Sequence, residues 1–172
     1  MTIPVYQVDA FTMGSFSGNP AAVCPLDAWL DDETMQNIAA ENNLSETAFI
    51  VAGEESYGLR WFTPAIEVDL CGHAPLAAGY VVLNHLQSDL DSVSFDTISG
   101  QLTVVRDGDR LSMDFPARIP RPVAVSEALS DALGEAPSEV HESRDILAVY
   151  EDEASVRRLS PDQAKLLALD EG

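Results

Sequence analysis

The sequence predicts an α+β fold in which a β-barrel-like sheet wraps around one central, buried helix. Residues 73–86 leave almost no polar face, and a helix that is apolar all round is buried on all sides. Short segments with strand-like patterns precede and follow this helix, so we expect the strands to surround it. We expect one complete unit of this kind over residues 1–118. A linker and the start of an incomplete second unit should occupy residues 119–172.

The strands of the first unit are expected where apolar residues alternate with polar ones or gather in short runs. In chain order they are residues 5–11, 21–26, 46–52, 59–63, 93–96, 101–106 and 110–115. The last two flank Asp107-Gly108, a dipeptide typical of tight hairpins. A helix should run from Asp31 or Asp32 to about Asn42, because acids in a first turn suit the helix dipole. Residues 12–20 are rich in Gly and Ser and should form a loop.

The pattern changes in residues 115–123, which contain Pro116, Pro120 and Pro122 and are expected to link two units. Beyond them the sequence favours three helices and one strand. The helices are expected at residues 126–133, 153–159 and 161–169, and the strand at residues 146–150. These residues are too few to repeat the strand-rich first unit, so the second unit is expected to be incomplete.

Charge and composition exclude several function classes. The chain has 29 acids against 9 bases, a net charge of −20, and nucleic-acid binding needs clustered Lys and Arg. This acid excess, with Lys165 as the only lysine, suggests adaptation to high salt.

No apolar run approaches the roughly 20 residues of a membrane span. The N-terminus lacks the basic and apolar regions of a signal peptide, so we expect a cytoplasmic protein.

The two cysteines, Cys24 and Cys71, lie far apart and have no CxxC spacing, so neither a disulfide framework nor a metal site is expected. Cys71 precedes the start of the predicted buried helix, where a thiol could act as a nucleophile or base. A buried, inert thiol is the commoner case.

Two other segments could carry chemistry. Glu46 lies where a helix ends and an increasingly apolar strand begins, and a half-buried carboxyl there could act as an acid or base. The alternative is a solvated glutamate. Gly72 and His73 open the buried helix, whose free N–H groups could bind a substrate carboxylate, with His73 facing the same cavity. The alternative is a capped helix with a structural histidine. Residues 17–20 form either a simple turn or a set of donors that includes Asn19.

Four ordered segments together resemble the PhzF-like family, which is named after the phenazine-biosynthesis isomerase and has the diaminopimelate-epimerase-like fold. They are Val8-Asp9-Ala10-Phe11, Gly18-Asn19-Pro20-Ala21-Ala22-Val23, Asn43-Leu44-Ser45-Glu46-Thr47 and Cys71-Gly72-His73-Ala74. The resemblance implies two similar domains, each a sheet wrapped around a helix, with the site between them at the N-termini of the two helices. It also implies catalysis without a metal or an organic cofactor.

The resemblance further implies roles for residues of these motifs. Glu46 matches the acid/base that moves a proton between carbons of a small carboxylic acid, and His73 matches a residue that assists. Gly72 and Ser45 match positions that help to hold the substrate. Asn19 and Ala74, from the same motifs, are assigned with them to substrate binding.

The sequence departs from the family pattern in two places. Pro75 stands where the family commonly has Thr, which removes one N–H and one hydroxyl from the expected anion site. Residues 120–172 match neither the acidic partner nor the second Gly-rich helix start that the family carries in its second domain. We therefore expect roughly half of a family site, completed in a homodimer or by a complementary half.

Two other functions stay open at this point. One is a cysteine-dependent racemase or epimerase that uses Cys71, for which the second thiol would have to be Cys24. The other is a non-catalytic half-domain that binds a partner.

Overall fold

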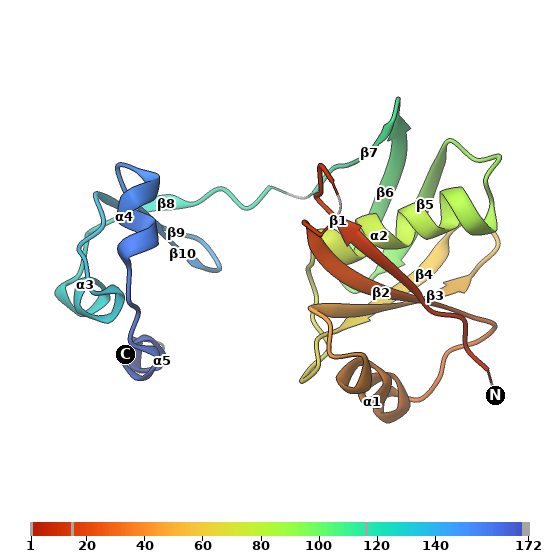
Figure 1. Ribbon diagram of the computed structural model, residues 1–172, viewed down its shortest axis with the longest axis horizontal. Helices are drawn as coiled ribbons and strands as arrows, with labels where there is room; N and C mark the ends of the chain where they lie inside the picture. The colour runs from red at the N-terminus through yellow and green to blue at the C-terminus, as the bar shows by residue number, and fades with distance from the viewer. Residues whose placement is uncertain (1, 15, 116, 170–172) are drawn as a thin grey trace. The chain divides into compact units, whose positions relative to one another are not determined.

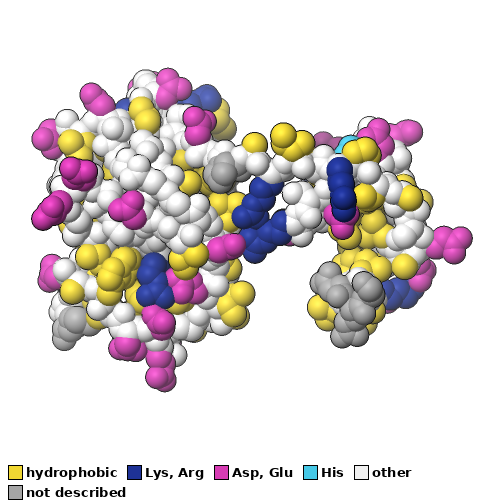
Figure 2. Space-filling model, turned by 180° about the vertical axis from the view of Figure 1, so that it is seen from behind, with side chains coloured by type: hydrophobic (Ala, Val, Ile, Leu, Met, Phe, Trp, Pro, Cys, Tyr) yellow, Lys and Arg dark blue, Asp and Glu magenta, His cyan; other side chains and the backbone are white. Residues whose placement is uncertain are grey.

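A computed structural model describes residues 2–14, 16–115 and 117–169 and divides them into two compact units (Figure 1). The first unit contains the described residues up to Phe115, and the second contains those from Ala117 onward. None of the helices in these ranges is long and apolar enough to cross a membrane. Acidic side chains are spread over the face of the first unit drawn in Figure 2 and do not gather in one patch.

The first unit is a seven-stranded sheet whose strand order follows the chain order. The strands are β1 (Tyr6–Ala10), β2 (Asn19–Leu26), β3 (Glu46–Ala52), β4 (Tyr57–Phe62), β5 (Ser92–Thr97), β6 (Gly100–Asp107) and β7 (Arg110–Met113). Two neighbouring pairs, β2–β3 and β4–β5, are parallel, and the others are antiparallel. Parallel neighbours need a crossover connection, and each pair has a helical one.

The two crossovers lie on opposite faces of the sheet. Helix α1 (Asp32–Asn42) joins β2 to β3 and contacts β3 and β4. Helix α2 (His73–Val81) joins β4 to β5 and contacts β1, β2, β3, β5, β6 and β7. Figure 1 shows the sheet curling around α2 while α1 lies outside the curl. The predicted α+β fold with a sheet wrapped around a central helix is confirmed.

Both faces of the central strands are buried, which explains their nearly continuous apolar sequence. On β3, Ala48 and Ile50 join the inner core around α2, whereas Phe49 joins the outer core beneath α1. Trp61 and Phe62 on β4 divide in the same way. Successive residues of these strands thus pack alternately against α2 and against α1.

Helix α2 is shorter than the predicted helix over residues 73–86. It ends at Val81, and the chain continues as a π-helical segment, η1 (Val82–Leu86). Arg106 holds this end of the helix, since its guanidinium donates to the carbonyl of Leu83 within η1 and to that of Leu90 beyond it, the latter at 3.1 Å.

The second unit contains more strand than the sequence predicted. Its elements are β8 (Arg121–Val123), α3 (Glu127–Leu133), β9 (Glu139–Glu142), β10 (Ile146–Val149), α4 (Glu153–Arg158) and α5 (Gln163–Leu169). The three strands form one sheet in the order β10-β9-β8. β8 lies in the segment predicted to be a linker, and it accommodates Pro122 because an edge strand tolerates a missing N–H. β9 was not predicted, because Val140 is its only buried residue.

Candidate active site

The candidate site lies where β2, β3 and the start of α2 meet. β2 and β3 are parallel, and Ala21 pairs with Glu46, so both strands begin at the same edge of the sheet. This register brings Asn19, the first residue of β2, next to Ser45, which immediately precedes β3. His73 reaches the same edge because it is the first residue of α2. The structure thus brings together residues that lie up to 54 positions apart.

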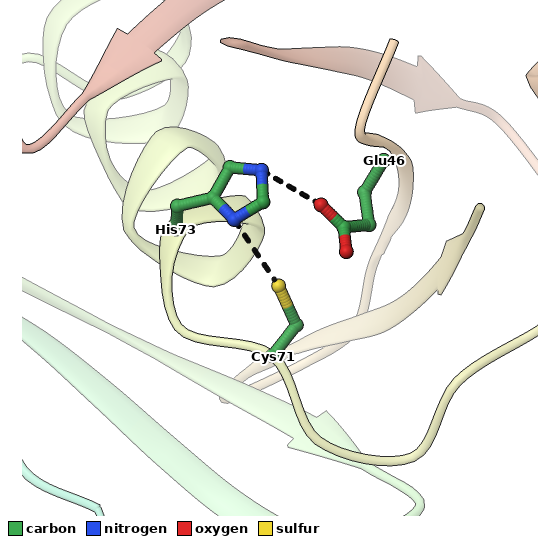
Figure 3. A group of neighbouring side chains, drawn as sticks. All are labelled: Glu46, Cys71 and His73. Atoms are coloured by element: carbon green, nitrogen blue, oxygen red, sulfur yellow. Dashed lines mark hydrogen bonds and ion pairs between the residues drawn. The ribbon is translucent and has the colours of Figure 1, made fainter. Parts of the chain in front are cut away.

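Glu46 and His73 form a close pair at this edge. Glu46 Oε2 lies 2.7 Å from His73 Nε2, and the two side chains are only 15% and 6% exposed, respectively. Figure 3 shows the Glu46 carboxylate facing one nitrogen of the imidazole ring. Both atoms are buried, and neither has an aligned hydrogen-bond partner in the described part of the chain. The two groups are in contact but not aligned as a hydrogen bond, so each retains bonding capacity for a further group.

The other ring nitrogen of His73 meets two side chains. Asn19 Nδ2 lies 3.1 Å from His73 Nδ1, and Cys71 Sγ lies 3.4 Å from the same nitrogen. Ser45 Oγ donates to Asn19 Oδ1 at 2.8 Å. A connected set of polar groups therefore runs from Ser45 through Asn19 and His73 to Glu46.

The surroundings of Cys71 favour the protonated thiol over the thiolate. Burial raises the pKa of Cys71, and the neighbouring Glu46 carboxylate acts in the same direction. Backbone N–H groups of Ala74 and His73 donate to the sulfur and oppose this shift without reversing it. The thiol is consequently protonated at neutral pH.

The side chains of Glu46, Cys71 and His73 also present possible metal ligands, with ligand atoms within 4.8 Å of one another. The carboxylate and the thiol, however, contact different nitrogens of the ring (Figure 3). Asn19 also contacts Nδ1, the nitrogen nearer the thiol. A single ion bound through one ring nitrogen would require these side chains to move. The arrangement suits hydrogen bonding and proton transfer better than metal binding.

Gly72 caps α2 without a side-chain hydrogen bond to the helix. The first N–H groups of a helix lack internal partners and carry partial positive charge. A Cβ at Gly72 would lie 3.6 Å from the Phe11 ring and 3.7 Å from the Phe115 ring. Phe11 has a φ of 57°, a left-handed conformation that is uncommon for an aromatic residue. Two aromatic rings thus flank the helix start where a carboxylate was expected to bind.

Ala74 and Pro75, which follow His73 in the motif, are both buried. The Ala74 methyl group belongs to the inner core, and the Ala74 N–H is directed at Cys71. Pro75 has no N–H and lies in the first turn of α2, where the helix itself leaves N–H groups unpaired.

A cavity of about 500 Å³ lies beside α2. It is lined by Phe11, Leu76 and Tyr80 among others, and by none of Glu46, Cys71 and His73. Its position alone would not have identified the candidate site.

Sequence reasoning did not single out Ser99, which helps to place the segment that carries Cys71. Ser99 Oγ donates to the Asp69 carbonyl at 2.6 Å, which ties the turn between β5 and β6 to the segment before α2. The two residues are 30 positions apart, and no local pattern around Ser99 indicates such a contact.

Comparisons with known proteins match nearly the whole chain. A family model described as "Phenazine biosynthesis-like protein" matches residues 8–171. An uncharacterized isomerase of Pseudomonas aeruginosa is 54% identical over 98% of this chain and 65% of that protein. An uncharacterized isomerase of Halalkalibacterium halodurans is 44% identical over 99% of this chain and 65% of that protein. A crystal structure of a phenazine biosynthesis protein of the PhzF family from Enterococcus faecalis has a TM-score of 0.90 and 45% identity, covering 99% of this chain and 65% of its own. The chain thus spans about two thirds of the length of these proteins.

Proposed function

Because the chain belongs to the phenazine biosynthesis-like family, we propose that it carries the Glu46 half of an isomerase active site. In the proposed reaction, Glu46 moves a proton between two carbons of a small carboxylic acid, and His73 assists. The reaction uses no metal and no organic cofactor. The observation that carries this proposal is the 2.7 Å contact between Glu46 Oε2 and His73 Nε2, in side chains that are largely buried.

The proton balance of the reaction is simple. The Glu46 carboxylate takes a proton from a carbon next to an electron-withdrawing group, and the electron pair of the broken C–H bond moves into the adjacent conjugated system. The protonated Glu46 then returns the proton to a different carbon, which restores the carboxylate. The atoms of the substrate are unchanged, and only the position of one hydrogen and of the double bonds differs.

The start of α2 would hold the substrate carboxylate. Gly72 presents no side chain there, so a ligand can approach the free N–H groups of the first turn. These groups would also stabilise the negative charge that develops as the proton leaves carbon. Pro75 supplies no N–H, so we expect the anion to be bound by fewer donors than a non-proline residue at this position would allow.

The part of the relatives that this chain does not match would complete the reaction. We propose that it supplies an acidic partner and a second anion-binding helix start. These would reach Glu46 within one longer chain or through association with a complementary half or a second copy. We further propose that the reaction takes place in the cytoplasm.

Hydrogen exchange with solvent tests the proposal directly. A panel of small unsaturated carboxylic acids is incubated in D₂O with the chain and with a chimera that adds the C-terminal third of the Pseudomonas aeruginosa relative. Mass spectrometry then detects deuterium at carbon. We expect at least one acid to gain one deuterium with the chimera, and Glu46→Gln to remove that gain while the variant stays folded. Exchange that survives Glu46→Gln would refute the role of Glu46.

One observation favours a second candidate, a cysteine-dependent epimerase, because Cys71 Sγ lies 3.4 Å from His73 Nδ1. Two features weigh against it. Burial raises the pKa of Cys71, and Cys24 is fully buried in the outer core beneath α1, whereas Cys71 packs against the inner core. The two thiols therefore cannot face one substrate carbon from opposite sides. Loss of exchange in Cys71→Ser, with exchange retained in Glu46→Gln, would favour the cysteine mechanism.

A further inference from the structure

We propose that Ser45 and Asn19 are positioning residues that hold His73 as the neutral tautomer protonated on Nε2, so that its N–H faces Glu46. The inference rests on the proposed function in one respect, because it assigns the protonation state in which Glu46 begins the reaction. It also gives Asn19 and Ser45 a role that acts through His73, in place of direct substrate binding.

The contacts on the two sides of the ring, with Asn19 at Nδ1 and Glu46 at Nε2, together define a direction of hydrogen bonding. The Ser45 hydroxyl donates to Asn19 Oδ1, and a carbonyl oxygen can only accept. This bond places the Asn19 NH₂ group on His73 Nδ1 at 3.1 Å, and an amide NH₂ can only donate. Nδ1 must then accept, so the proton of a neutral ring is on Nε2. That nitrogen lies 2.7 Å from Glu46 Oε2, and a carboxylate in contact with the ring at this separation is favourable only when Nε2 carries a proton.

Cys71, the other side chain at Nδ1, is compatible with the same direction. The backbone N–H groups of His73 and Ala74 donate to its sulfur, and burial keeps the thiol protonated. The remaining hydrogen-bonding capacity of Cys71 is its S–H, and two acceptors are near the sulfur: His73 Nδ1, 3.4 Å from Sγ, and the Glu46 carboxylate. A thiol that donates to either of them leaves Nδ1 free to accept from Asn19.

The opposite orientation of the amide has a physical cost. If Asn19 were turned over, its oxygen would face Nδ1 and would require a proton there. A neutral ring would then present a bare Nε2 to the Glu46 carboxylate at 2.7 Å, which is repulsive unless Glu46 is protonated. An imidazolium would relieve the repulsion, but it would hold Glu46 in an ion pair and weaken it as a base.

The arrangement follows from the parallel pairing of β2 and β3. Because Ala21 lies opposite Glu46, the start of β2 and the residue before β3 are side by side at the sheet edge. Ser45 and Glu46 are consecutive, and they act on opposite nitrogens of one ring. Among the described residues, the titratable groups that contact the His73 ring are Glu46 and Cys71, and the proposed tautomer is compatible with both contacts.

Nitrogen NMR of the histidine rings in the intact chain tests the proposal without any substrate. The chain contains three histidines, so His85 and His141 serve as internal references. In a ¹⁵N-histidine sample at about pH 8.5, where a histidine is ordinarily neutral, His73 should show an unprotonated Nδ1 and a protonated Nε2. A His73 ring protonated on Nδ1 in the unaltered chain would overturn the proposal.

Substitutions at Asn19 and Ser45 sharpen this test. Asn19→Asp places an acceptor-only group on Nδ1, so that nitrogen should become protonated. The matched control is Asn42→Asp, which adds the same charge near β3 at a residue that contacts Thr47 and should leave the His73 signals unchanged. Ser45→Ala should yield a mixture of both forms, and Ser45→Thr should restore the original one. Unchanged His73 signals in both Asn19→Asp and Ser45→Ala would refute the proposal.

The NMR outcome and the exchange outcome are independent. The tautomer could be as proposed in a chain that has no isomerase activity, and the isomerase could operate with a different tautomer. The two proposals therefore fail separately.

Discussion

Replacing Gly79 by alanine should destabilise the first unit, because α2 crosses β6 with no room for a side chain. A Cβ at Gly79 would lie 2.6 Å from Val104 Cγ1 and 2.8 Å from both Cβ and Cγ2 of Val104. Carbon atoms that are not bonded to each other rest about 3.5–4.0 Å apart. Val104 is fully buried, and its Cβ is attached directly to the backbone, so rotation of the side chain cannot relieve the overlap. The helix or the strand must move by roughly 1 Å.

Two opposing contributions set the size of the effect. Alanine is favoured over glycine within a helix by about 1 kcal/mol. Overpacking a filled core costs about 1–3 kcal/mol, and three short contacts to a β-branched residue place this site at the upper end. We therefore expect Gly79→Ala to lower the free energy of unfolding by about 2 kcal/mol. The corresponding fall in Tm is roughly 5–10 °C.

Tryptophan fluorescence during denaturant unfolding measures this change in the first unit alone, because both tryptophans, Trp29 and Trp61, lie there. Gly14→Ala is the control, since nothing lies within 4 Å of a Cβ at Gly14, and it should leave the midpoint nearly unchanged. Combining Gly79→Ala with Val104→Ala should cost less than the sum of the two single changes. A Gly79→Ala chain as stable as the unaltered one would refute the close approach of α2 to β6.

Two further predictions concern the site edge and the outer core. Gly72→Ala should change stability by less than about 0.5 kcal/mol, because the added methyl group makes only ordinary contacts with Phe11 and Phe115. The same change should slow deuterium exchange on the order of 10²-fold by displacing the substrate. A Gly72→Ala chain that exchanges as fast as the unaltered chain, or that loses exchange only because it unfolds, would contradict this. Burial raises the pKa of Cys24 from 9.0 to about 11, so the folded state holds this proton more tightly than the unfolded state. The resulting stabilisation is complete below pH 9 and is lost between pH 9 and 11. The free energy of unfolding in urea should therefore fall less steeply with pH in this range for Cys24→Ala than for the unaltered chain. The same fall in both chains would argue against a raised pKa of Cys24.

The wrapped architecture of the first unit could be predicted because its signals are local. The apolar surface of α2 and the alternation along the strands are visible in short windows of sequence. The end of α2 at Val81 could not be predicted, since no local pattern marks the π-helical segment, and the Arg106 side chain that donates to its Leu83 carbonyl is more than 20 positions away. β9 was missed because Val140 alone points into the core.

The candidate site shows the same division between local and distant information. Glu46 and His73 could be singled out from their neighbours in sequence and from the motif resemblance. Their 2.7 Å contact, however, depends on how β3 and α2 pack together. The position of Asn19 on His73 depends on the parallel register of β2 and β3, which connects residues 54 positions apart. No local pattern carries that register, so the sequence indicated donors near Asn19 without indicating what they contact.

The central claim is that Glu46 carries the proton, and a matched pair of glutamine substitutions tests it most directly. Glu46→Gln and Glu67→Gln each remove one carboxylate from a partly buried glutamate of the first unit, but Glu67 pairs with Arg60 and not with His73. Using the acid that exchanges with the chimera, we expect Glu46→Gln to slow deuterium incorporation by about 10²–10⁴-fold, and Glu67→Gln to retain most of the rate in the folded protein. Equal rates in the two variants, with both folded, would contradict the assignment of Glu46 as the acid/base.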